Sequence, residues 1–371
     1  MNIGFDAKRA FYNTSGLGNY SRSTINLLAK YFPEDNHFLF TPEIENAVTF
    51  DTGRAKIIQP ETDFYKFFKS FWRSYGMTTN FKKLKLDVFH GLSNEVPINS
   101  HFLRTRTIVS IHDLIFIRYP DLYKPIDREI YYKKFKASVH KADKIIAISQ
   151  QTKSDIINFL AADEKKIEVV YQGCNEIFSI KKTELELQKT RQKYNLPQQF
   201  ILNVGTIEAR KNALQILKAA HFEKIEIPIV FIGKRTDYQD ELEEFIEEQK
   251  VKNQVIFINN VHFADLPAIY QMASVFVYPS IFEGFGIPIL EAMNSGIPVV
   301  TSKGSCFPET GGDAALYAFH EDFEELAAQI KTALYNSEIR QQLIEKGSKR
   351  VLLFHDKDIA NNIMKVYKSL F

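Results

Sequence analysis

The sequence predicts an α/β protein with two doubly wound parallel-sheet domains, and three observations support this. Short apolar runs of strand length alternate with stretches of helical periodicity along the chain. A polar, charged stretch at about 179–199 interrupts the alternation, which then begins again. The length of 371 residues is sufficient for two cores. We therefore expect one domain over 1–180, a second over 181–355, and a final helix over 356–371 that packs back on the first.

The composition is that of an ordinary globular enzyme, with 45% hydrophobic and 25% charged residues. A net charge of +2 argues against bulk binding of nucleic acid, so we expect no nucleic-acid partner. Cys174 and Cys306 match no metal-ligand spacing and are expected to be reduced thiols of a cytoplasmic protein. We find no signal-peptide pattern and no apolar run long enough to span a bilayer.

In the first half, the sequence predicts strands over 2–6, 87–91, 107–111, 144–149 and 167–171. A polar loop and then a helix follow the first of these strands. Gly16 and Gly18 stand at the entrance of that helix, where a phosphate or sugar could approach the backbone closely. The third glycine of a dinucleotide-binding fingerprint is missing, which disfavours a nicotinamide oxidoreductase.

His112 directly follows the strand over 107–111, at the carboxyl end where open α/β sheets bind ligands. A lone histidine is more often structural, so both interpretations stay open from the residues alone. Asp113 would orient the ring or cap the following turn. Ser149 is expected to cap a helix that runs through Ile156 and Phe159.

Residues Phe64–Leu86 interleave aromatic side chains with lysines and arginine. This pattern predicts an amphipathic helix, and one interpretation is that the helix rests on an anionic membrane surface. The alternative is a helix that buries its apolar face in its own domain.

In the second half, strands are expected over 200–205, 228–233, 255–258, 275–278 and 299–301, and helices over 214–220, 239–249 and 266–272. Arg210 and Lys211 stand between the first of these strands and the helix that follows it. Two adjacent cations suit a diphosphate, Arg in bidentate fashion and Lys as a point charge. A solvated basic turn is the alternative.

The stretch from Glu283 to Glu291 follows the strand over 275–278 and contains two glycines and Pro288. Proline favours the first turn of a helix, and the free N–H groups of a glycine loop and helix start bind anions. The two carboxylates suit sugar hydroxyls rather than phosphate. A site for hydroxyls and diphosphate together suggests a nucleotide-sugar. The alternative is an ordinary strand–helix turn in which Glu291 interacts with the helix dipole.

Other patterns are discounted. Asp356 and Asp358 have the spacing of a metal-binding D-x-D motif, but they stand at the start of the final helix, where Asp residues cap. The sequence has no His/Cys cluster with metal-ligand spacing, so we expect no metal site. It also lacks a nucleophile elbow and a phosphate-binding Walker loop.

These motifs resemble those of the family 4 glycosyltransferases, a retaining group with the GT-B fold that is also called group 1. The E-x7-E element from Glu283 to Glu291, within a specific pattern that begins at Pro279, carries the resemblance most strongly. Further matches occur in order along nearly the whole chain, at 16–20, 88–91, 111–114, 296–300 and 308–315. The resemblance implies two Rossmann-like parallel-sheet domains that face a cleft.

The resemblance also implies roles for individual residues. Glu283 would hold hydroxyls of the donor sugar, Glu291 would hold the ribose, and His112 would contact the transferred sugar. Arg210 and Lys211 would neutralise the leaving diphosphate. The donor-binding residues that it implies are Gly16, Gly18, Gly205, Thr206, Asn260, Val261, Gly284, Phe285, Gly286 and Ile287, and those of the acceptor side are His90 and Asn94. Many members have Arg after the glycine at Gly205, where this chain has Thr206, so Arg210 is expected to replace that cation.

The implied reaction is retaining, metal-independent transfer of a hexose from a nucleotide-sugar, a substrate rather than a cofactor. The motifs are most similar to those of mannosyltransferases that use GDP-mannose, and UDP-glucose or another UDP-sugar is the alternative donor. The acceptor is expected to be a glycan or lipid-linked glycan of a surface polysaccharide such as lipopolysaccharide. The enzyme would then work in the cytoplasm, peripherally at the inner face of the membrane. A GT-B nucleotide-sugar epimerase, which needs no acceptor, is the alternative function.

Overall fold

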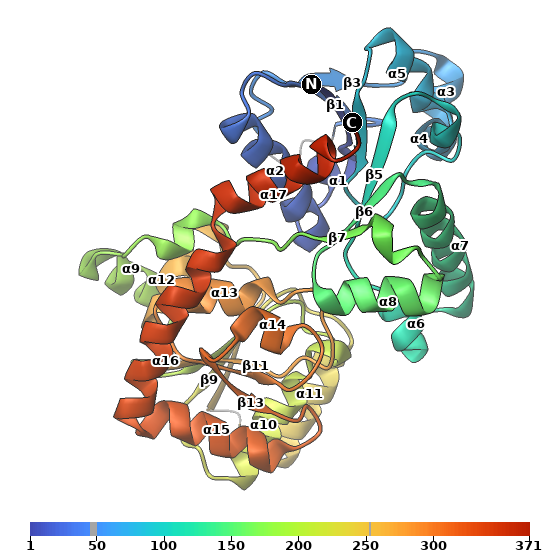
Figure 1. The fold of residues 1–371 in the computed structure, drawn as a ribbon. Coiled ribbons are helices and arrows are strands. Elements are labelled where there is room, and N and C mark those ends of the chain that lie inside the picture. The colour runs from blue at the N-terminus through green and yellow to red at the C-terminus, as the bar shows by residue number, and fades with distance from the viewer. Residues whose placement is uncertain (45–49, 252–253) are drawn as a thin grey trace. The chain divides into compact units, whose positions relative to one another are not determined.

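The computed structural model describes residues 1–44, 50–251 and 254–371, which form two compact units (Figure 1). The first unit comprises Met1–Gln172 and Asp356–Phe371, and the second comprises Gly173–His355. The segment 173–180, which we expected in the first domain, belongs to the second. The reason is that the Phe178 side chain is fully buried there, with its ring 5.5 Å from that of Tyr270.

Within the described residues, the first unit contains a seven-stranded parallel sheet in the order β3-β2-β1-β4-β5-β6-β7. Its strands are β1 (Asn2–Asp6), β2 (Asn36–Phe40), β3 (Lys56–Ile58), β4 (Val88–Gly91), β5 (Arg106–Ile111), β6 (Lys144–Ala147) and β7 (Ile167–Val169). Its α-helices are α1 (Lys8–Tyr12), α2 (Gly16–Tyr31), α3 (Asp63–Phe67), α4 (Lys69–Ser74), α5 (Thr79–Lys83), α6 (Ile115–Arg118), α7 (Pro125–Lys141), α8 (Gln150–Leu160) and α17 (Asp356–Lys368).

The second unit, in the part of the chain that the structure describes, contains a six-stranded parallel sheet in the order β10-β9-β8-β11-β12-β13. Its strands are β8 (Ile201–Val204), β9 (Ile229–Ile232), β10 (Val255–Ile258), β11 (Val275–Tyr278), β12 (Val299–Ser302) and β13 (Ala315–Ala318). Its α-helices are α9 (Glu184–Tyr194), α10 (Ala213–Phe222), α11 (Tyr238–Glu248), α12 (Leu266–Met272), α13 (Ile287–Asn294), α14 (Phe307–Gly311), α15 (Phe323–Tyr335) and α16 (Ser337–Arg350).

Helices cover both faces of the second sheet, which explains why its strands are continuous apolar runs. Phe276 of β11 packs toward α12 and α13, whereas its neighbours Val275 and Val277 pack toward α10 and α15. The strand therefore has no polar face. The predicted parallel α/β architecture is confirmed in both units, although β2, β3 and β13 lie outside the strands predicted above.

The final helix, α17, belongs to the first unit and lies beside α2 (Figure 1). It buries one face that includes Ile359, Ile363 and Tyr367. The hydroxyl of Tyr367 hydrogen-bonds Nδ1 of His90 in β4 at 2.6 Å. This buried polar contact ties the last helix to the centre of the first sheet.

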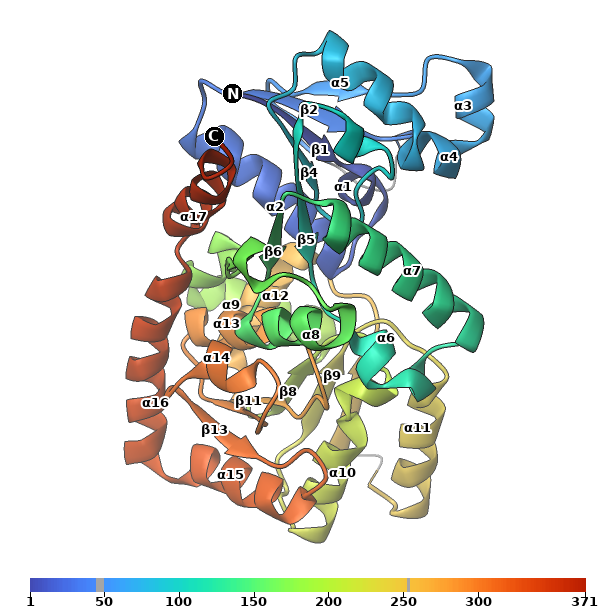
Figure 2. The same ribbon diagram turned by 45° about the vertical axis from the view of Figure 1, so that its right-hand side comes forward.

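The segment Phe64–Leu86 does not form the single amphipathic helix that its sequence predicts. It is broken into α3, α4, a 3₁₀ turn over Gly76–Thr78, and α5 (Figure 2). Trp72 and Phe81 are both buried against the ring of Phe40. In one straight helix these two side chains would lie roughly two and a half turns apart and point to opposite sides. Burying both in one cluster therefore requires the breaks.

Candidate active site

Two loops of the second unit bring the predicted cations and a predicted carboxylate together. Arg210 and Lys211 follow β8, and Glu283 follows β11. These two strands are neighbours and parallel, so the loops that follow them leave the same edge of the sheet. The backbone N–H of Ile281 also donates to the carbonyl of Arg210 at 2.9 Å, which joins the loops directly.

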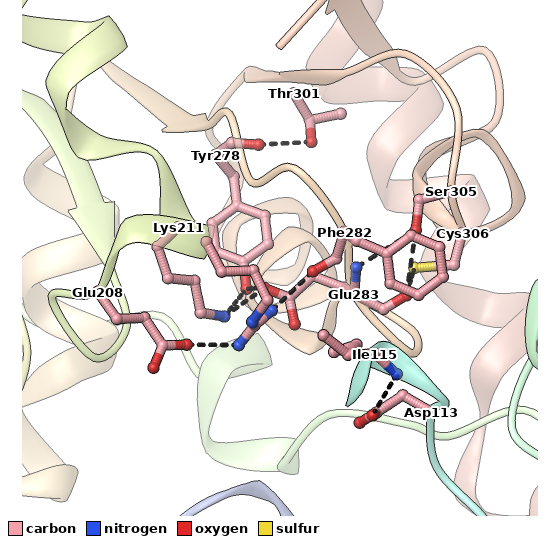
Figure 3. Close-up of polar contacts among 11 residues, drawn as sticks. Asp113, Ile115, Glu208, Lys211, Tyr278, Phe282, Glu283, Thr301, Ser305 and Cys306 are labelled. Carbon is pink, nitrogen blue, oxygen red and sulfur yellow. Dashed lines mark hydrogen bonds and ion pairs between the residues drawn. The ribbon is translucent and has the colours of Figure 1, made fainter. Parts of the chain in front are cut away.

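Glu283 is the centre of this cluster. One carboxylate oxygen of Glu283 lies 2.5 Å from Nζ of Lys211 and 2.7 Å from Nη1 of Arg210. The hydroxyl of Tyr278 accepts from Lys211 at 2.5 Å and donates to Glu283 at 3.0 Å. Figure 3 shows the Lys211 and Tyr278 side chains directed at the Glu283 carboxylate. The four side chains form one connected set of charge-assisted contacts.

The cluster keeps Glu283 ionised. Its side chain is 13% exposed, and burial disfavours the charged form, but the ion pairs with Lys211 and Arg210 outweigh burial and lower its pKa to about 2. Burial likewise opposes the charge of Arg210, and Glu283 raises its pKa all the same. The site thus presents a fixed carboxylate between two fixed cations at neutral pH.

Arg210 has two further hydrogen-bond partners, and Asn212 anchors the same loop. Arg210 donates to Glu208 at 2.6 Å and to the carbonyl of Phe282 at 2.7 Å. Asn212, in the left-handed region with a φ of 60°, donates to the carbonyls of Pro279 and His320. The hydrogen bonds of Arg210 and Asn212 therefore fix the loop that carries both cations before a ligand binds.

Glycines shape the space around Lys211. Gly205 has a φ of +151°, and a Cβ there would lie 3.4 Å from Cε of Lys211. A Cβ at Gly233 would lie 1.7 Å from the carbonyl oxygen of Gly205, so the loop needs glycine at that position too. Thr206 is half-buried beside them. Gly205 thus lies directly against the Lys211 side chain, and its positive φ favours glycine at this position.

The turn into α13 has the predicted form. Gly286 has a φ of +94° and precedes the first helical residue, Ile287, and Pro288 stands in the first turn, as predicted. Gly284 and Phe285 are buried just before it. The main-chain N–H groups at the start of α13 form the anion-favouring end of this helix.

Glu291 lies in α13 in an environment opposite to that of Glu283. It accepts a hydrogen bond from the hydroxyl of Tyr270 at 2.9 Å. Burial raises its pKa to about 7, and the bond from Tyr270 opposes that rise only in part.

Two further predicted donor-binding residues, Asn260 and Val261, follow β10 at the same edge of the sheet. Asn260 is exposed and Val261 is half-buried.

In the first unit, the structure brings His112 and Asn94 together directly after β5. The backbone N–H of His112 donates to the side-chain oxygen of Asn94 at 2.9 Å. Nε2–H of the ring donates to the carbonyl of Leu92 at 2.8 Å, and the ring packs edge-to-face on Tyr20 at 4.5 Å. Burial lowers the pKa of His112 to about 4. The imidazole is therefore neutral at physiological pH, with a fixed ring orientation.

Gly16 and Gly18 lie in the first turn of α2, at the helix entrance where we expected them. A Cβ at Gly18 would lie 1.8 Å from the carbonyl oxygen of Asn13, so Gly18 is required by the fold. At Gly16, a Cβ would meet no atom of the described residues within 4 Å. Of these two glycines, Gly16 is the one beside which a ligand has room to approach the helix N-terminus.

His90, which we expected on the acceptor side, lies in the core of the first unit. Its side chain is fully buried, and its two ring nitrogens hydrogen-bond Tyr367 at 2.6 Å and Ser110 at 2.8 Å. Burial lowers its pKa to about 3. His90 is a neutral core residue, because β4 is covered on both faces.

Tyr278 and Glu208 belong to the cluster but were not predicted from the sequence. Tyr278 is the last residue of β11 and is fully buried, which made it indistinguishable from a core aromatic. Its position at the carboxyl end of a strand was the available signal.

Among residues 1–44, 50–251 and 254–371, no group of three or more His, Cys, Asp or Glu side chains is arranged to hold a metal ion. No helix within these described ranges is long and apolar enough to cross a membrane.

Comparison with known proteins identifies the family. The model described as Glycosyl transferases group 1 matches residues 186–350, and that described as Glycosyltransferase Family 4 matches residues 19–176. O-antigen chain mannosyltransferase B of Escherichia coli is 31% identical over 76% of this chain and 74% of its own length. O-antigen chain mannosyltransferase RfbU of Salmonella typhimurium is 30% identical over 71% of this chain and 68% of its own length.

A solved structure matches the fold of the whole chain. The sucrose-phosphate synthase of Thermosynechococcus elongatus superposes with a TM-score of 0.78 at 21% identity, covering 100% of this chain and 99% of that one. At this identity the likeness concerns the fold alone. With the two family matches and the relatives at about 30% identity, the chain belongs to the family 4, or group 1, glycosyltransferases of the GT-B fold.

Proposed function

We propose that this chain is a retaining hexosyltransferase that moves mannose from GDP-mannose to a glycan or lipid-linked acceptor of a surface polysaccharide. The observation that carries the proposal is the convergence of Arg210 and Lys211 on Glu283 at the carboxyl edge of the second sheet. The names of the two relatives, both O-antigen chain mannosyltransferases, support the choice of mannose and of a polysaccharide.

The cluster suits the charge that develops in such a reaction. Cleavage of the anomeric C–O bond leaves negative charge on the nucleoside diphosphate and positive charge on the sugar. Cations that are already in place stabilise that negative charge without reorganisation. Lys211 is held by Glu283 and Tyr278, and Arg210 is held by Glu283 and Glu208. The N–H groups at the start of α13 add to the positive field.

Glu283 would accept hydrogen bonds from hydroxyls of the transferred sugar, since its carboxylate is ionised. It is a poor candidate for a covalent nucleophile because two cations compete for the same oxygen. In the retaining reaction that we propose, the acceptor therefore attacks from the side of the leaving group, without a covalent intermediate on Glu283. We propose that Arg210 and Lys211, rather than a metal ion, neutralise the diphosphate.

The proposal is tested by measuring donor binding and transfer. Because a ligand that binds only the folded state raises its melting temperature, GDP-mannose should raise Tm more than UDP-glucose or ADP-glucose at equal concentration. GDP should be released only when a glycan or lipid-linked acceptor is present, and at the same rate in the presence of EDTA.

Three outcomes would contradict parts of this proposal. A larger Tm shift with UDP-glucose would identify UDP-glucose, rather than GDP-mannose, as the donor. Loss of turnover in EDTA would contradict neutralisation by the two side chains. Conversion of the nucleotide-sugar to an isomer without acceptor, and without GDP release, would favour a nucleotide-sugar epimerase instead.

A further inference from the structure

A further loop of the second unit, to which no role has been assigned, contacts Glu283. The loop follows β12 and leads into α14, and it contains Gly304, Ser305 and Cys306. β11 and β12 are neighbouring parallel strands, so this loop leaves the same edge of the sheet as the loop that carries Glu283. It therefore approaches Glu283 from the side of β12, whereas the loop of the two cations approaches from the side of β8.

The hydroxyl of Ser305 holds both main-chain polar groups of Glu283. Its Oγ accepts from the N–H of Glu283 at 3.3 Å and donates to the carbonyl of the same residue at 3.1 Å. Sγ of Cys306 donates to that carbonyl as well, at 3.2 Å. Burial raises the pKa of this thiol well above its ordinary value, so it keeps the proton that it donates. Figure 3 shows Ser305 and Cys306 beside the main chain of Glu283.

These contacts fix the direction in which the Glu283 side chain leaves the backbone. The peptide unit before its Cα is held by Ser305 at the N–H and by Arg210 at the carbonyl of Phe282. The peptide unit after its Cα is held by Ser305 and Cys306 at the carbonyl. Because peptide units are planar, holding both of them leaves the Cα–Cβ bond little freedom. The carboxylate is therefore kept beside the two cations with which it pairs.

Ser305 has a backbone conformation that glycine would adopt at a lower cost. Its φ is +50°, in the left-handed region, and it follows Gly304, whose φ is +83°. A residue with a side chain is uncommon in this region and is strained there. Glycine has no such penalty. The fold therefore accommodates a strained serine at a position where its hydroxyl contacts Glu283.

We propose that Ser305 is a positioning residue for the transfer reaction, and that it acts through Glu283. The inference rests on the proposed function, in which the Glu283 carboxylate accepts hydrogen bonds from hydroxyls of the transferred sugar. Ser305 does not itself contact the sugar. It fixes the main chain of Glu283, so that the carboxylate meets the sugar at one distance and one angle. The rate of a positioned reaction depends strongly on such geometry.

The test separates the hydroxyl of Ser305 from its backbone strain. Ser305→Gly and Ser305→Ala both remove the hydroxyl, but only glycine relieves the strain. Both variants should lower kcat about tenfold to a hundredfold, as misplacement of a reacting group does. The melting temperature of Ser305→Gly should exceed that of Ser305→Ala. The Kd of the nucleoside diphosphate without sugar, GDP for the proposed donor, should stay close to the wild-type value in both.

Lys224→Gly is the matched control for relief of strain. Lys224 also lies in the left-handed region, with a φ of +55°. It follows α10, which connects the parallel strands β8 and β9, so it lies at the edge of the sheet opposite to the site. Lys224→Gly should therefore keep the kcat of the wild type.

A double-mutant cycle measures whether Ser305 acts through Glu283. Glu283→Ala removes the carboxylate that is to be positioned, so adding Ser305→Gly to it should lower kcat by less than about twofold further. Glu283→Gln is a second background, in which the further loss should again be smaller than in the wild type. The Tm of each variant shows whether it is folded. Turnover is measured with the nucleotide-sugar that raises the Tm of the wild type most.

Four results would overturn the inference. These are a wild-type kcat in Ser305→Gly, an equal loss of kcat from Ser305→Gly with and without the Glu283 carboxylate, a loss of nucleoside diphosphate affinity as large as the loss of kcat, and the same loss of kcat in Lys224→Gly. Failure of the proposed function looks different. The wild type itself would then transfer no mannose from GDP-mannose, and the comparison of the Ser305 variants would be made with the donor that it does use.

Discussion

Lys211 is the side chain whose removal should most affect the proposed reaction. Its ammonium contacts both Glu283 and Tyr278. We expect Lys211→Ala to lower kcat about a hundredfold to a thousandfold, as loss of a preorganised charge does at other sites. Arg210 still pairs with Glu283 in this variant, so Tm should change far less.

A smaller change isolates the hydroxyl of Tyr278. Tyr278→Phe keeps every charge and should lower kcat about tenfold. Lys303→Ala is the control, because Lys303 pairs with Glu325 outside the cluster. For the Lys211 prediction, wild-type turnover in Lys211→Ala would show that the Lys211 ammonium has no part in the reaction.

Glu291 should give the enzyme a pH dependence of its own. Because its folded pKa, about 7, lies above the ordinary value, the folded state keeps a proton that the unfolded state has released. Stability should therefore fall as pH rises from about 4.5 to about 7, and this contribution should stay constant above that range. In Glu291→Gln this part of the slope should vanish. Melting temperatures measured between about pH 4.5 and 8 check this, and an unchanged slope in the variant would contradict it.

The grouping of site residues was predictable where residue type and position along the chain both indicated it. Arg210, Lys211 and Glu283 stand in loops that follow neighbouring strands, and the structure brings them into one cluster. The burial of His90 was not predicted, because the exposure of a strand residue depends on which helices cover the sheet, and the covering helix here, α17, is distant in sequence. Long-range packing of this kind is not readable from a local motif.

At the scale of elements, the two glycines of α2 should behave differently although they stand two positions apart. Gly18→Ala would place a methyl group against the carbonyl of Asn13, and should destabilise the fold by about 1–3 kcal/mol or more. Gly16→Ala has open space and a helical position, so its Tm should equal or exceed that of the wild type.

Donor binding is the second measurement for this pair. If the donor contacts the N-terminus of α2 at Gly16, Gly16→Ala should weaken the binding of GDP-mannose about tenfold without any loss of Tm. Equal donor affinity in Gly16→Ala and the wild type would show that the N-terminus of α2 does not contact the donor.

Most strands were predicted from apolar runs because both faces of a parallel sheet are buried. β2 and β3 were missed, since β2 begins with the polar pair Asn36 and His37, and β3 is only three residues long. The segment Phe64–Leu86 was predicted as one helix because its composition is uniform. In the structure the segment is broken into shorter helices, because Trp72 and Phe81 are buried in one cluster. This is a tertiary contact that the local sequence does not show.

At the scale of the whole molecule, α17 should contribute to the stability of the first unit through Tyr367. In Tyr367→Phe, Nδ1 of the buried His90 loses its partner, which should cost about 1–3 kcal/mol. The free energy of unfolding in urea measures this loss. Tyr335→Phe, at an exposed position of the second unit, should leave it unchanged. Equal stability of both variants would show that the Tyr367 hydroxyl is not needed.

The discontinuity of the first unit has a consequence for biosynthesis. Residues 1–172 leave the ribosome first, yet their partner, α17, is translated only after all of 173–355. The second unit is contiguous and can complete its fold before the first one does. A nascent chain that stalls within 173–355 therefore displays the apolar surface that Ile359, Ile363 and Tyr367 later cover. This surface stays uncovered until α17 has left the ribosome and packed against the first unit.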